Sequence, residues 1–185
     1  MRRRIYGAAV PNGSVVGLDL SLRASAAAAV AFNWDQKLVS VKTRTFGCEL
    51  EDASSQRERI QRMVNIADGV LAFCKETQAR AVYVEDHAFG MGGRSANQTI
   101  EMTGIVKARL FDDWGVVVVP VASASARKTL LQHLVRSDVK KWVVKNVRRL
   151  GKESLHWSDD EIDAFVIMNH GLMVQGGTAM TFLGV

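Results

Sequence analysis

The chain has 185 residues, of which 48% are hydrophobic, and its formal net charge is +5. This length suits one α/β domain with a substantial core, and the hydrophobic content excludes a largely disordered chain. The excess of cations favours a polyanionic partner. The two cysteines, Cys48 and Cys74, do not form a CxxC pair, which argues against a disulfide framework or a zinc site and favours a reducing, cytoplasmic location.

The two ends of the chain carry no sign of a membrane anchor. The basic start, residues 1–4, lacks the apolar segment that follows in a secretory signal, and no apolar stretch reaches membrane-spanning length. We expect residues 1–13 to form a flexible basic arm, residues 14–174 to form the domain, and residues 175–185 to form a flexible tail. No membrane partner is expected.

The first part of the domain is predicted to be three β-strands. Short β-like runs cover residues 14–20, 25–33 and 37–46, and residues 33–36 provide a turn between the second and the third.

Two helices and a fourth strand follow. A helix is predicted over residues 54–77, a strand over 81–85 and a second helix over 97–113, after a Gly-rich segment. The apolar stripe of the first helix is predicted to comprise Ile60, Met63, Val64, Ala67, Val70, Leu71 and Cys74. That of the second is predicted to comprise Ile100, Ile105, Val106 and Leu110.

The last predicted elements are one strand and two helical segments. Residues 116–121 are continuously apolar, which predicts a strand buried on both faces. Residues 137–150 have an amphipathic helical pattern with cations on the outer side. Ser158 and Glu161 have the spacing of a capping box, so the final helix is predicted to begin there.

Acidic residues stand where these elements would otherwise be apolar. Asp19 and Glu85 each end a strand-like run, and a carboxylate in such a place requires a cation or hydrogen-bond donors. Asp160 and Asp163 are three residues apart at the start of the last helix, but Asp159 and Asp163 are four apart, so spacing leaves open which upstream aspartate points inward. Taken singly, each acid could serve a helix terminus or a turn.

Taken together, the acids predict a metal site. Hard oxygen ligands that converge from two strands and one helix are what Mg²⁺ or Mn²⁺ requires in a protein. Because the acids lie far apart in sequence, the prediction depends on the fold bringing them together.

The element order is three strands, then helix, strand, helix, strand and helix. This order is typical of a ribonuclease H-like α/β fold, in which a mixed five-stranded sheet has three antiparallel strands followed by parallel strands and is flanked by helices. The sheet should place the acids of its first and fourth strands beside the last helix.

Three motifs resemble those of the RuvC family of Holliday junction resolvases, and in particular its phage-encoded RuvC-like branch. Residues 17–21, Gly-Leu-Asp-Leu-Ser, match the family pattern Gly-(Ile/Leu/Val)-Asp-x-(Gly/Ser). Val84 and Glu85 match its Val-Glu pair, and residues 160–164 match its Asp-x-x-Asp-Ala pattern at the last helix. The resemblance covers roughly residues 14–171.

This resemblance implies a crossover junction endodeoxyribonuclease. Such an enzyme resolves Holliday junctions or other branched DNA by paired phosphodiester hydrolysis that leaves 5′-phosphate and 3′-hydroxyl ends. It implies two Mg²⁺ ions per active site, with Mn²⁺ as a substitute, and a phage protein acting in the host cytoplasm. The implied catalytic and metal-binding residues are Asp19, Glu85, Asp160 and Asp163.

DNA contacts are predicted mainly in the basic stretch over residues 127–152, whose cations suit phosphates, although a charged face can also be merely solvated. By resemblance, Phe89 would pack against bases at the branch point, and the alternative is that it covers the core after its strand. The family's Gly-x-Gly turn is missing here, because residues 129–137 contain no glycine. The predicted DNA-binding residues are Phe89, Arg94, Lys128, Lys140, Lys141, Lys145 and Arg148.

The near two-fold symmetry of a four-way junction predicts a homodimer. The helix over residues 97–113 is a candidate interface because Thr103, Gly104 and Ala108 would permit close approach, although small residues suit packing on the sheet equally well.

Three other functions are compatible with parts of the pattern. A broader ribonuclease H-like nuclease would cut flaps or RNA:DNA hybrids with the same carboxylates. An actin-like or sugar kinase ATPase has a phosphate loop similar to residues 17–21, but it needs a second such domain. A non-catalytic junction-binding module would have no need for clustered acids.

Overall fold

The computed structural model describes residues 14–22, 25–32, 38–47, 55–86, 94–131 and 157–176, together with Asp138, Lys141 and Val143. Its strands are β1 Ser14–Asp19, β2 Ser25–Phe32, β3 Leu38–Phe46, β4 Ala79–Glu85 and β5 Val118–Val121. Its helices are α1 Gln56–Glu76, α2 Arg94–Trp114, α3 Ser123–Leu131 and α5 Asp159–Gly176.

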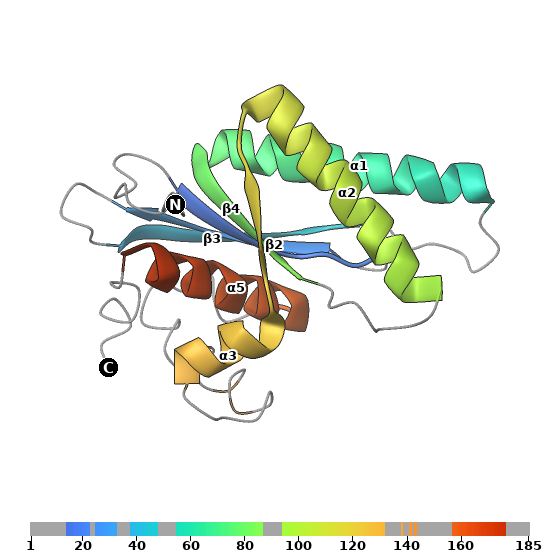
Figure 1. Cartoon of the computed structure of the whole chain (residues 1–185). Helices are drawn as coiled ribbons and strands as arrows, with labels where there is room; N and C mark the ends of the chain where they lie inside the picture. The colour runs from blue at the N-terminus through green and yellow to red at the C-terminus, as the bar shows by residue number, and fades with distance from the viewer. Residues whose placement is uncertain are drawn as a thin grey trace, which may run out of the picture.

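The strands form one five-stranded sheet in the order β3-β2-β1-β4-β5 (Figure 1). Strands β1, β2 and β3 pair antiparallel, whereas β4 pairs parallel with both β1 and β5. The predicted mixed sheet of three antiparallel strands followed by parallel strands is therefore confirmed. Parallel pairing brings the carboxyl ends of β1 and β4 to the same edge of the sheet.

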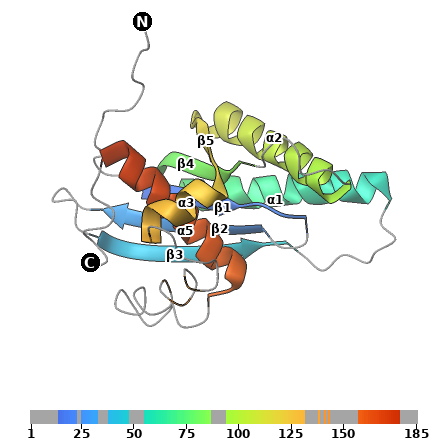
Figure 2. The same cartoon turned by 60° about the horizontal axis from the view of Figure 1, so that its bottom comes forward.

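Helices cover both faces of the sheet. α1 and α2 lie together on one face, and α5 lies on the other with α3 packed beside it (Figures 1 and 2). The salt bridge from Arg109 on α2 to Asp68 on α1 has an N–O distance of 3.0 Å and links the first pair. α5 crosses the sheet and contacts β1, β2 and β4.

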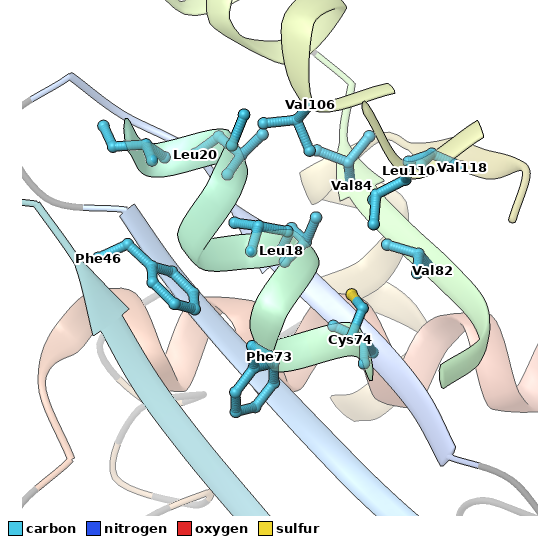
Figure 3. Close-up of a cluster of buried hydrophobic side chains, with 14 of the residues drawn as sticks. Leu18, Leu20, Phe46, Phe73, Cys74, Val82, Val84, Val106, Leu110 and Val118 are labelled. Carbon is cyan, nitrogen blue, oxygen red and sulfur yellow. The ribbon is translucent and has the colours of Figure 1, made fainter. Parts of the chain in front are cut away.

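The main core lies between the sheet and the pair α1 and α2 (Figure 3). Successive residues of a strand point to opposite faces, so Val16 and Leu18 of β1 and Val82 and Val84 of β4 all enter this core. The residues between them face α5 on the other side. One strand face therefore supplies the core, and the other is available for the predicted acids.

Helix α1 begins with a capping box at Ser55. The Ser55 backbone N–H donates to the Glu58 carboxylate at 2.5 Å, and the Glu58 N–H donates to Ser55 Oγ at 3.3 Å. The predicted apolar stripe was partly wrong, because Ile60 is 50% exposed while Ile66 and Phe73 are buried. The buried face is rotated toward Ile66 and Phe73, which leaves Ile60 on the flank of the helix.

Helix α2 also differs from its predicted stripe. Val106 and Leu110 are buried as predicted, but Ile100 is 52% exposed and Met102 is buried instead. Thr103 faces inward, where its hydroxyl donates to the Thr99 carbonyl at 2.8 Å.

Strand β5 is not buried on both faces, which corrects the prediction from its apolar run. It is the last strand of the sheet, and Val117 just before it is 66% exposed. Pro120 has no backbone N–H to donate, so it suits a strand at an edge. The prediction failed because a continuous apolar run can occur in an edge strand as well as in a central strand.

The short helix α3, residues 123–131, follows β5 directly and was not predicted from the sequence. The predicted helix over residues 137–150, the basic arm and the C-terminal tail fall mostly or wholly outside the described residues. Among the helices that are described, none combines the length and the apolar content needed to cross a lipid bilayer.

Candidate active site

Asp19 and Glu85 stand side by side at the carboxyl ends of β1 and β4. Leu18 pairs with Val84 in the parallel register, and each acid is the next residue of its strand. Because side chains alternate between faces, both acids leave the core side and turn toward α5. The sequence Leu18-Asp19 thus places a core side chain and a site side chain in succession.

The start of α5 brings two further acids to the same place. A capping box fixes this start, in which the Ser158 N–H donates to the Glu161 carboxylate at 2.8 Å and the Glu161 N–H donates to Ser158 Oγ at 3.2 Å. The predicted start at Ser158 is therefore confirmed. Asp163 is only 8% exposed, and Asp160 is half-buried.

The ambiguity between the two upstream aspartates is resolved by burial. Asp159 is exposed, whereas Asp160 and Asp163 both act electrostatically on Asp19. One inward face therefore carries Asp160 and Asp163, and Asp159 belongs to the outer side of the first turn.

Asp19 is the electrostatic centre of this group. Burial, then the neighbouring Glu85 carboxylate, and then Asp163 and Asp160 raise the pKa of Asp19 from 3.8 to about 8. The protonated Asp19 carboxyl donates a side-chain hydrogen bond to Glu85. Asp19, Glu85, Asp160 and Asp163 will be called the acidic cluster.

The donor set of the acidic cluster is chemically suited to a hard divalent cation. Its carboxylates come from three elements, and their mutual repulsion is what a cation would relieve. As the side chains stand, however, no three acidic, histidine or cysteine residues of the described chain are arranged to hold a metal ion. Asp19 is paired with Glu85 instead, so cation binding would require this hydrogen bond to open.

The predicted DNA-binding residues are only partly within the described chain. Lys128 is exposed on α3, which packs against α5, and Lys141 is exposed as well. Arg94 begins α2, but only its backbone is described. Phe89, Lys140, Lys145 and Arg148 lie outside the described residues.

The sequence interpretation did not anticipate two glycines at the contact between α5 and the sheet, Gly17 of β1 and Gly171 of α5. Gly17 and Gly171 lie where the helix backbone or a tyrosine ring leaves no room for a side chain. A glycine in the middle of a strand is a known mark of close backbone approach, and this signal was present at Gly17.

The chain has the ribonuclease H-like fold and is similar in structure to solved Holliday junction resolvases. RuvC of Thermus thermophilus in complex with a Holliday junction substrate matches with a TM-score of 0.64 at 19% identity, over 90% of this chain and 97% of that one. The yeast mitochondrial Holliday junction resolvase Ydc2 matches with a TM-score of 0.62 at 13% identity, over 94% of this chain and 84% of that one.

A third match is the fowlpox virus resolvase, solved with Holliday junction DNA. Its TM-score is 0.53 at 12% identity, over 87% of this chain and 97% of that one. No protein-family model matches the sequence, and no curated protein is significantly similar to it. The resemblance to RuvC is therefore confirmed at the level of the fold.

Proposed function

We propose that this protein is a structure-specific endonuclease that resolves Holliday junctions or other branched DNA, that is, a crossover junction endodeoxyribonuclease. The observation that carries the proposal is the convergence of Glu85, Asp160 and Asp163 on Asp19. This convergence occurs in a fold shared with junction resolvases of bacterial, mitochondrial and viral origin. A structural role alone gives no reason to collect acids that repel one another.

In the proposed mechanism, the acidic cluster would hold two Mg²⁺ ions. When bound, such ions supply an activated water and neutralise charge on the scissile phosphate. Asp19 would be a ligand together with Glu85, Asp160 and Asp163, because these three carboxylates already act on it electrostatically. The expected products carry 5′-phosphate and 3′-hydroxyl ends.

Exposed lysines are proposed to hold the DNA. Lys128 is exposed on the helix that packs against α5, and Lys141 is exposed too. With a net charge of +5, the chain suits a polyanion, and phosphate contacts would supply most of the affinity. The same surface would serve a flap or a hybrid duplex, so specificity has to be measured.

A homodimer is proposed through one face of α2. Ile100, Gly104, Ala108 and Phe111 are spaced four, four and three residues apart, and all are exposed. Ile100 and Phe111 are 52% and 60% exposed, which is unusual for large apolar side chains on one helix face. This set will be called the α2 outer face, and a second copy would bury it while placing two active sites on one junction.

Three labelled substrates test the function: a four-way junction, a flap and an RNA:DNA hybrid, each incubated with and without Mg²⁺. We expect Mg²⁺-dependent paired cuts in the junction, with products that a ligase can rejoin, and much slower cutting of the other two. Preferred cleavage of the flap or hybrid would show a broader ribonuclease H-like nuclease instead. Junction binding without any cleavage, or cleavage by Asp19→Asn at the wild-type rate, would contradict the proposal.

A further inference from the structure

The backbone of α5 lies directly against β1 at Gly17. A Cβ built on Gly17 would stand closer than 3.0 Å to the carbonyl oxygen of Ala164 and the backbone nitrogen of Met168. These two atoms are four residues apart in the helix and belong to one turn of its hydrogen-bond ladder. A methyl group at residue 17 would therefore press against helix backbone, which cannot rotate out of the way as a side chain can.

A second close contact joins α5 to β4. A Cβ on Gly171 would fall inside the normal contact distance of the Tyr83 ring, and Tyr83 is only 1% exposed. Tyr83 is the register partner of Gly17 in the parallel pair of strands. The two glycines therefore fix the same helix against two neighbouring strands, one from the sheet side and one from the helix side.

Both contacts involve strand residues that are two positions before an acid of the acidic cluster. Gly17 and Asp19 are two residues apart and share one face of β1, as Tyr83 and Glu85 share one face of β4. Ala164, which touches Gly17, directly follows Asp163 on α5. The separation of α5 from the sheet therefore sets how closely Asp163 can approach Asp19.

We propose that Gly17 and Gly171 are positioning residues for the active site, an inference that rests on the proposed function. By leaving no side chain between α5 and the sheet, they hold the two α5 acids within reach of Asp19 and Glu85. A methyl group at either place forces the helix outward until ordinary contact distance is restored. A shift on the order of 1 Å in a catalytic arrangement can lower a rate about 100-fold.

The chain provides a matched control in Gly69 of α1. Gly69 also lies in a helix against an aromatic ring, because its Cβ would be 2.8 Å from Cδ1 of Phe46. This contact belongs to the core on the opposite face of the sheet. Gly69→Ala should therefore disturb packing as the other two substitutions do, without moving the acids.

The test measures Mn²⁺ affinity by calorimetry without DNA, thermal unfolding, and junction cleavage for Gly17→Ala, Gly171→Ala and Gly69→Ala. We expect the first two to weaken Mn²⁺ binding about 10- to 100-fold and to slow cleavage about 100-fold, with junction binding retained. Gly69→Ala should change the unfolding temperature only. Equal Mn²⁺ affinity in all three variants would overturn the proposal.

Two rescue experiments separate positioning from simple loss of stability. Asp163→Glu lengthens the side chain by one bond of about 1.5 Å, so it should impair the wild type but restore activity at least about 10-fold in Gly17→Ala. Tyr83→Leu should restore activity to Gly171→Ala by making room for the methyl group. This second rescue keeps the test decisive if Gly17→Ala does not fold. Failure of both rescues would reject the proposal.

Crystal structures provide a measure that does not depend on the enzyme's activity. An α5 of Gly17→Ala or Gly171→Ala that lies in its wild-type place would overturn the positioning role even if the wild type cut junctions efficiently. A displaced α5 in a protein that never binds Mn²⁺ or cuts DNA would uphold the geometry and reject the proposed function.

Discussion

Asp19 and Glu85, at the ends of adjacent parallel strands, are joined by a hydrogen bond between their carboxyl groups. One of the two must carry a proton for this bond to form. The fold thus brings together acids that oppose one another electrostatically, and burial adds to the cost of ionising Asp19. A site of this kind lowers the stability of the cation-free protein at alkaline pH, and this has measurable consequences.

The stability of the cation-free protein should fall as pH rises from about 4 to about 8. The pKa of Asp19 is about 8 in the folded chain and near 3.8 when unfolded, so in this range the folded state binds more protons and each rise in pH favours unfolding. Each unit of pKa difference corresponds to about 1.4 kcal/mol. Asp19→Asn should flatten this dependence and stabilise the protein at pH 8, as measured by urea denaturation in EDTA.

Asp159→Asn is the control for this measurement, since Asp159 is exposed on the same helix turn as the inward acids. It should leave the slope of stability against pH nearly unchanged. A slope in Asp19→Asn as steep as that of the wild type would show that another group causes it.

Mg²⁺ should stabilise the folded protein at pH 8, because a cation bound by the acidic cluster replaces the proton and offsets the repulsion among the carboxylates. A ligand present at 100 times its dissociation constant adds about 2.7 kcal/mol to the free energy of unfolding. The rise in unfolding temperature should be reversed by EDTA and absent in Asp19→Asn. An equal rise in Asp19→Asn would place the binding site elsewhere.

Substitution of the inward Asp163 and of the exposed Asp159 at the start of α5 should affect junction cleavage differently. Asp163 is 8% exposed and acts on Asp19, whereas Asp159 is exposed. In Asp163→Asn, the rate of junction cleavage should fall by more than the 10- to 100-fold that is typical when an outer-shell partner of a metal ligand is removed. Asp159→Asn should cut junctions at close to the wild-type rate. Rates measured on one labelled junction decide this, and similar losses in both variants would contradict the inward assignment.

Much of the fold followed from local patterns in the sequence. The antiparallel strands, the order of the later elements and the capping box of α5 all depend on residues near one another in the chain. The choice between Asp159 and Asp160 as the inward acid could not be made from the sequence, because both have helical spacing to Asp163. It depends on which side of α5 faces the sheet.

The errors share a physical cause. Ile60 and Ile100 have the periodicity of buried residues, yet about half of each side chain is exposed. The apolar run before Pro120 has the composition of a central strand, yet β5 is at the edge of the sheet. Periodicity identifies an apolar face but not how far the neighbouring element extends over it. The closeness of α5 to β1 was likewise hidden, since it depends on the absence of a side chain at Gly17.

Lysines introduced on the α2 outer face should prevent dimer formation. In Ile100→Lys with Phe111→Lys, two like charges would face their symmetry mates in an isologous interface. Sedimentation should show a dimer for the wild type and a monomer for this variant, with paired incision lost and single nicks remaining. Val117→Lys, at a 66% exposed apolar residue outside α2, is the control and should stay dimeric. A monomeric wild type would contradict the proposed assembly.

Charge reversal at Lys128 and Lys141 should weaken junction binding in a salt-dependent way. Both side chains are exposed, and Lys128 lies on the helix that packs against α5. Each phosphate contact contributes about 0.9 to the slope of log affinity against log salt concentration, so Lys128→Glu with Lys141→Glu should lower that slope by about 2. Lys75→Glu, at an exposed residue in the last turn of α1, should leave the slope unchanged. Because the proposed cleavage site is the acidic cluster and not these lysines, the double variant is expected to cut still at saturating enzyme. An unaltered slope would remove these lysines from the proposed DNA interface.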